Sequence, residues 1–97
     1  MTERNPLVEA RSASTTVTGV DTDGNGDVEV VVGGLREIES PADVDAQAAD
    51  GYVANVQSVT GNSVTVRLFE SAGSNAEMAA VTGGSGVTDL YVQAEGQ

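Results

Sequence analysis

The feature that most constrains the fold of this chain is a series of short runs in which β-branched and polar residues alternate, with glycine-rich turns between them. The runs are residues 15–20, 28–32, 53–60, 63–70 and 88–94. Alternation with a period of two places every second side chain on the same face of a strand. Runs of this length with regular turn signals predict short antiparallel strands and argue against a parallel α/β sheet.

Two turn sequences predict hairpins. Gly61-Asn62 separates residues 53–60 from 63–70, and a two-residue loop with glycine first favours a type II′ turn. Asn25-Gly26 lies between residues 15–20 and 28–32, and both residue types accept a positive φ. We therefore expect one hairpin on each side of the chain's midpoint.

The alternation also predicts which side chains face the core. In residues 63–70, one face carries Val64, Val66 and Leu68, and the other carries Thr65, Arg67 and Phe69. In the last run, Leu90 and Val92 alternate with polar residues and are expected to point inward.

Two connecting segments carry helical signals. Ser40-Pro41 with Asp43 and a closing Gly51 resembles a short capped helix, and Ser74 with Glu77 matches a capping box. An irregular loop is the alternative in both places. Both segments are short.

These patterns predict an all-β fold: a small antiparallel β-sandwich, jelly-roll or Ig-like, with short connecting helical turns, or else a small barrel. Residues 1–14 are expected to form a flexible or partner-docked arm, with Leu7 and Val8 as its apolar contacts, and residues 15–97 the sandwich domain. The core has to be built from sixteen Val, four Leu and one Ile, with only three aromatic residues. Because so thin a core opposes a large loss of chain entropy, we expect a homo-oligomer.

The charge balance indicates an environment of very high salt. Fifteen Asp and Glu face four Arg and no Lys, for a net charge of −11. Such a charge density opposes compaction in dilute buffer, whereas at molar salt the Debye length falls to about 3 Å and the repulsion is screened. We interpret the chain as halophilic; an acidic mesophilic adhesin module is the alternative.

Composition also excludes several partners. Nucleic acid and anionic membranes are not expected, because the four Arg are scattered and phosphate binding needs clustered bases. No apolar run reaches the length of a membrane span, and the first residues lack the apolar segment of a secretory signal, so Met1 is expected to begin a soluble chain. Without Cys there is neither a disulfide framework nor a thiolate site.

One segment resembles the opening of a calcium-binding loop. Its oxygen-bearing residues are Asp21, Asp23, Asn25 and Asp27. An EF-hand is excluded because Val32 occupies the twelfth position, where a bidentate Glu is required. A Ca²⁺ or Na⁺ ion at this loop and a solvated acidic turn are the two remaining interpretations, and no other cofactor is expected.

The chain lacks most of the groups that catalysis uses. There is no His for proton transfer near neutral pH, no Cys nucleophile and no Lys for a Schiff base. A pair of carboxylates can hydrolyse glycosides only in a cleft, usually with aromatic platforms that three aromatic residues hardly supply. We therefore expect no enzymatic activity.

Two groups of charged residues are candidates for binding. The acidic stretch contains Glu37, Glu39, Asp43, Asp45 and Asp50, and a hydrated surface is its simplest interpretation. Arg67, beside Phe69 in a strand, is the best interface candidate, because a guanidinium among many carboxylates tends to form bidentate pairs. An intrachain pair with Glu29 or a neighbouring acid is the equal alternative.

Three stretches give the chain a family resemblance. They are residues 16–20 with the Asp-Gly-Asn-Gly loop and residues 28–32, residues 53–70 with their Gly-Asn turn, and residues 86–92. In these stretches the chain resembles small virion structural proteins of tailed viruses that infect halophilic archaea. The resemblance implies a subunit on the capsid surface of the virion, acting as a decoration, cement or turret protein in symmetric oligomers. Its partners would be the major capsid protein or other virion proteins.

Two other functions remain open. A tail or baseplate component has no sequence feature that separates it from a capsid protein. A receptor- or carbohydrate-binding sandwich would need aromatic stacking, for which only Tyr52 and Tyr91 are available.

Overall fold

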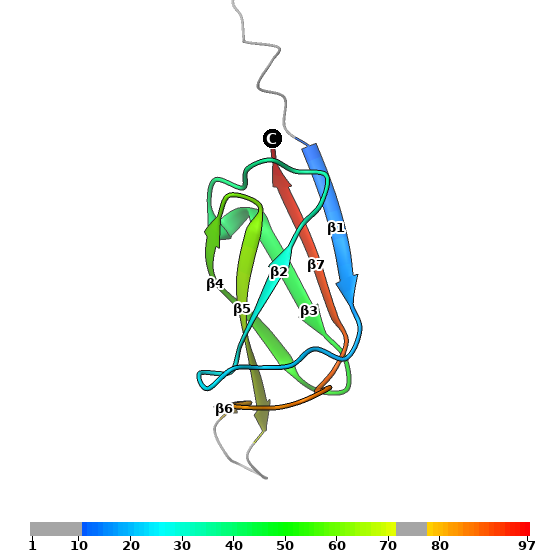
Figure 1. The fold of residues 1–97 in the computed structure, drawn as a ribbon, viewed down its shortest axis with the longest axis vertical. Helices are drawn as coiled ribbons and strands as arrows, with labels where there is room; N and C mark the ends of the chain where they lie inside the picture. The colour runs from blue at the N-terminus through cyan, green and yellow to red at the C-terminus, as the bar shows by residue number, and fades with distance from the viewer. Residues whose placement is uncertain (1–10, 72–77) are drawn as a thin grey trace, which may run out of the picture.

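The computed structural model describes residues 11–71 and 78–97, which form seven β-strands and one short 3₁₀ turn (Figure 1). The elements are β1 (Arg11–Val17), β2 (Asp27–Val31), η1 (Pro41–Asp43), β3 (Val44–Ala48), β4 (Val53–Thr60), β5 (Ser63–Ser71), β6 (Met78–Ala80) and β7 (Leu90–Gly96). All strand pairs are antiparallel. The predicted all-β sandwich with a short helical turn is therefore confirmed.

The strands form two sheets. Sheet A has the order β1-β7-β3, and sheet B has the order β2-β5-β4 with β6 also paired to β5. Phe69 of β5 pairs with Val53 of β4 and with Ala80 of β6, so β6 lies on the β2 side of β5. The outer edges of the sandwich are β1 and β3 in sheet A, and β4 and the β2/β6 side in sheet B.

A valine-rich core fills the space between the sheets. The largest fully buried side chains are Leu68, Leu90, Val32, Val64, Val66 and Val92. The inward positions predicted for residues 63–70 and for the last strand are all confirmed by this burial. Alternation is strict along β5, where Val64, Val66 and Leu68 are buried and the residues between them are half-buried.

The predicted hairpin between residues 53–60 and 63–70 is confirmed as β4 and β5, with Thr60 paired to Ser63 across the Gly61-Asn62 turn. The alternation of β4 has one irregularity. Val56 pairs with Val66 and Ser58 pairs with Thr65, which leaves Gln57 as an extra residue in a β-bulge.

The predicted hairpin between residues 15–20 and 28–32 is wrong. Both segments contain strands, but β1 pairs with β7 in sheet A and β2 pairs with β5 in sheet B. The connection pairs instead with the segment before β7: Val20 N–H donates to Thr88 O at 2.9 Å, and Val87 N–H donates to Val20 O at 2.8 Å. These bonds take the chain across the end of the sandwich, so the Asn25-Gly26 turn begins β2 without joining it to β1.

The segment after Ser40 is a turn followed by a strand. Ser40 Oγ accepts a hydrogen bond from Ala42 N–H, as the capping signal predicts, but η1 has three residues and β3 follows it directly. The helix expected to continue to Gly51 is therefore wrong. Asp50 (φ 61) and Gly51 (φ 85) form a tight turn that leads from β3 in sheet A to β4 in sheet B. The capping box of Ser74 and Glu77 lies outside the described residues.

The first strand begins four residues before the predicted boundary at Thr15. Residues 11–14 pair with β7, Arg11 lying opposite Gly96 and Ser14 opposite Gln93, so they belong to the sandwich and not to an arm. Residues 1–10 lie outside the described part of the chain.

Gln97 ties the end of β7 to the β2–η1 connection, because its N–H donates to Glu37 O at 2.9 Å and its carbonyl accepts from Arg36 N–H. Within residues 11–71 and 78–97, no helix has the length and apolar character needed to cross a membrane.

Candidate interaction surface

The outer face of sheet B brings together an ion pair, two amides and the chain's single phenylalanine. Paired residues in neighbouring strands point to the same side of a sheet, so Asp27, Arg67 and Asn55 form one row on this face. Val53, Phe69 and Ala80 form the next row, across β4, β5 and β6. We call these the polar row and the apolar row.

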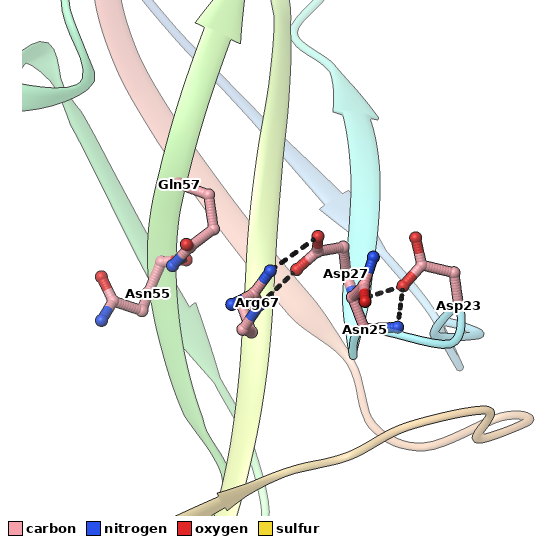
Figure 2. Close-up of polar contacts among 6 residues, drawn as sticks. All are labelled: Asp23, Asn25, Asp27, Asn55, Gln57 and Arg67. Carbon is pink, nitrogen blue, oxygen red and sulfur yellow. Dashed lines mark hydrogen bonds and ion pairs between the residues drawn. The ribbon is translucent and has the colours of Figure 1, made fainter.

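Arg67 and Asp27 form a bidentate ion pair at the centre of the polar row (Figure 2). Arg67 Nε donates to Asp27 Oδ1 at 2.7 Å, and Nη2 donates to Oδ2 at 3.2 Å. The two side chains are 35% and 16% exposed. The hydrogen bond to Asp27 raises the pKa of the Arg67 guanidinium above its ordinary value, and partial burial opposes that rise. The pair fixes the orientation of the planar Arg67 head, because two parallel bonds hold it to Asp27.

This ion pair is the intrachain alternative considered for Arg67, with Asp27 as the partner. Glu29 instead accepts a hydrogen bond from Ser63 Oγ at 2.7 Å. Arg67 and Phe69 still share the outer face, and each is partly exposed, so their assignment to an interface stays a prediction. Leu7 and Val8 lie outside the described residues.

Asn55 of the polar row and Gln57, two residues further along β4, both carry amide side chains (Figure 2). Both are exposed, and Gln57 Nε2 donates to the Asn55 carbonyl at 3.4 Å. Gln57 takes this position because the bulge adds one residue to β4 opposite β5. The outer surface of β4 therefore presents neutral hydrogen-bonding groups beside the ion pair.

The acidic loop before β2 uses its carboxylates to fix its own backbone. Asp23 Oδ1 accepts from the N–H groups of Asn25 at 2.8 Å and Asp27 at 2.9 Å (Figure 2), while Asp21 Oδ1 accepts from Gly86 N–H at 2.8 Å. The bonds from Asp27 and Asn25 hold the pKa of Asp23 below its ordinary value, because they stabilise its charged form.

Three of the four residues of the cation prediction therefore have side chains with different partners. Asp21 faces the segment before β7, Asp23 closes its own turn, and Asp27 pairs with Arg67. No group of three acidic side chains in a metal-binding arrangement occurs in the described ranges 11–71 and 78–97. Ca²⁺ or Na⁺ at this loop stays a prediction, and the geometry gives a carboxylate-capped turn as the loop's structural role.

Two exposed apolar side chains that the sequence reasoning did not select flank Phe69. Val53 is 48% exposed in the apolar row, and Met78 is 44% exposed. Met78 pairs with Ser71, two residues beyond Phe69 on the same face of β5. β6 was not predicted because three residues are too few to show alternation. The one sequence feature that indicated a strand here was the uncharged run Met78-Ala79-Ala80-Val81 in an otherwise acidic chain.

Tyr52 and Tyr91 do not form a shared aromatic platform. Tyr52 packs against the core beside β4, whereas Tyr91 is 39% exposed on β7, between neighbours whose side chains also point out of sheet A.

The acidic stretch is exposed throughout, and Asp43 and Asp45 line a shallow hollow with Gln93 and Glu95 of β7.

Comparisons with protein-family models, with curated proteins and with solved structures gave no match for this chain.

Proposed function

We propose that this chain is a non-enzymatic virion structural protein that assembles as a symmetric oligomer on the capsid surface, as a decoration, cement or turret subunit. The proposal takes the virus to be a tailed virus of halophilic archaea, in keeping with the acidic composition and the family resemblance. A tail or baseplate position is the alternative within the same class.

The observation that carries the proposal is the apolar row on sheet B. Val53, Phe69 and the neighbouring Met78 form an apolar group on the surface of a chain whose net charge is −11. An apolar group held on a sheet, with a polar row beside it, has the arrangement of a protein contact: a hydrophobic centre and a hydrogen-bonding rim.

The backbone structure is also compatible with a subunit whose role is to dock on a lattice without catalysing a reaction. Backbone hydrogen bonds of Gln97 tie the end of β7 to the β2–η1 connection, which opposes local opening at that end of the sandwich. A rigid subunit loses little entropy on docking, and repetition over a symmetric lattice multiplies weak contacts into a stable layer.

The test is co-sedimentation with capsids. The purified chain is mixed, in molar NaCl, with particles of tailed haloarchaeal viruses from which the surface proteins have been removed. We expect saturable binding that a Phe69→Ser/Met78→Ser double variant reduces at least tenfold, and that the matched outward-facing change Tyr91→Ser on sheet A leaves intact. Absence of binding, or equal losses in the two variants, would contradict the proposal.

A receptor- or carbohydrate-binding module is the second candidate, favoured by the amide of Asn55 in the row next to that of Phe69 and by the exposed amide of Gln57 further along β4. Amide and guanidinium groups next to an aromatic side chain are the usual means of holding sugar hydroxyls. A glycan array probed in molar NaCl distinguishes the two: specific glycan binding, lost in Asn55→Ala, would favour this candidate over the capsid subunit.

A further inference from the structure

Among the edge strands of five or more residues in the described part of the chain, β4 is the one that carries no charge. Residues 51–66 contain no Asp, Glu, Lys or Arg, although charged residues make up 20% of the chain. β4 lies wholly inside that segment and is eight residues long. In residues 11–71 and 78–97, no strand pairs with its outer side, because β4 pairs only with β5.

The other edges differ from β4 in charge or length. β1 contains Arg11, β2 contains Asp27 and Glu29, and β3 contains Asp45. β6 has three residues, too few for a ladder. Charged side chains and short strands are the usual means by which proteins keep a sheet edge from pairing with another chain. β4 has neither form of protection, and its β-bulge at Gln57, another feature that protects an edge, leaves Val53–Val56 regular.

At the molar salt expected for so acidic a chain, the local charge at a contact matters more than the net charge of the whole subunit. At molar salt the Debye length is about 3 Å, so the net charge of two approaching copies is screened and only directly opposed groups interact. A two-fold contact between copies of β2 sets acid near acid, which destabilises a strand pair. A two-fold contact between copies of β4 opposes no charges at all.

From these observations we infer that β4 pairs in antiparallel fashion with β4 of a second copy, joining the two B sheets into one continuous sheet. The bulge at Gln57 bends the strand, so the regular segment Val53–Val56 makes the ladder. This pairing covers Val53, which is 48% exposed in the single chain, and places the two apolar rows side by side. It deepens the proposed function, on which it rests only in taking the chain to assemble with copies of itself.

The first test compares two matched amide-to-acid variants by sedimentation equilibrium in molar NaCl. Gln57→Glu puts a carboxylate directly beside the proposed Val53–Val56 ladder, and Gln93→Glu makes the same change on the exposed outer face of β7. We expect a wild-type species of twice the chain mass, a dissociation constant raised severalfold or more in Gln57→Glu, and no change in Gln93→Glu. Equal effects of the two variants, or a wild-type monomer at every concentration, would overturn the inference.

The second test locates the contact directly. Because the chain has no cysteine, Asn55→Cys and Thr16→Cys each provide a single site for a spin label. β3 contacts β4, so β1 forms the opposite side of the sandwich. Labels on Asn55→Cys should lie close together across the new ladder, and labels on Thr16→Cys should lie far apart. The reverse order refutes pairing through β4.

The two proposals fail independently. A chain that binds capsids but shows no close Asn55→Cys pair retains the proposed function and loses this inference. A chain that dimerises through β4 but binds no capsid retains the inference and loses the proposed function.

Discussion

Replacing Leu68 with alanine is expected to remove a large share of the stability of this domain. Leu68 lies on β5 at 0% exposure, between β2/β6 and β4, in a core where valine is the common residue. The change deletes three carbon atoms, a transfer loss of about 2.4 kcal/mol at about 0.8 kcal/mol per buried methylene. The cavity left behind raises the expected cost to about 3–4 kcal/mol, within the range measured for buried Leu→Ala changes.

The expected cost of Leu68→Ala is large compared with the total unfolding free energy of the domain. A domain of 97 residues has an unfolding free energy on the order of 5–15 kcal/mol, so Leu68→Ala removes about a fifth of it or more. Urea denaturation in molar NaCl, followed by circular dichroism, measures the change without altering ionic strength as guanidinium chloride does. Val31→Ala, at a side chain that is 60% exposed, is the control and is expected to cost less than about 0.5 kcal/mol. A loss below about 1 kcal/mol for Leu68→Ala would refute the view that the two sheets close over a single tightly packed core.

Three further predictions concern the ends, the charge and the acidic loop. Gly96→Ala should lower the midpoint of thermal unfolding by several degrees, because a Cβ at this position overlaps the Glu37 carbonyl; Glu95→Ala, one residue away and exposed, is the control. Raising NaCl from millimolar to molar should raise the unfolding midpoint steadily, whereas sucrose at equal osmolality should do so far less; equal effects would contradict charge screening. The pKa of Asp23 is lowered in the folded state, so its stabilising contribution is present above the ordinary value of 3.8 and is lost as pH falls through the lowered value. The stability difference between the wild type and Asp23→Ala should therefore shrink below about pH 4, and a difference constant with pH would contradict this role.

Local alternation and turn chemistry predicted the part of the fold in which partners are close in sequence. The β4–β5 hairpin follows from Gly61-Asn62 and the period of two on each side, and both its existence and its inward residues are confirmed. The first hairpin failed because Asn25-Gly26 specifies a turn and not the strand that precedes it. The partner of residues 18–22 is the segment before β7, and no local pattern encodes a contact that distant.

β3 was missed because its sequence is atypical of a strand. Val44–Ala48 contains two alanines, a glutamine and an aspartate, and a capping serine precedes it. Its place in sheet A comes from pairing with β7, which overrides the weak strand propensity. The sequence feature that indicated a strand on each side was the dipeptide Asp50-Gly51, because Asp-Gly commonly forms the turn between two strands.

The candidate surface was predicted in part. Arg67 and Phe69 were placed on one face by alternation alone, since both lie in the same strand. Asp27 as the partner of Arg67 required the register of β2 against β5, which the sequence does not define. Val53 and Met78 reach the same face from strands on opposite sides of β5, so only the assembled sheet shows that they are neighbours of Phe69.

The pairing of Arg11 with Gly96 has a practical consequence for anyone who wishes to attach a peptide or fluorophore to this domain. It puts both ends of the described sandwich at one pole, and the apolar row with β6 lies at the other (Figure 1). A cargo joined after Gln97 would project away from the surface proposed to touch the particle. The domain would then act as an adaptor that binds through one pole and carries the cargo at the other.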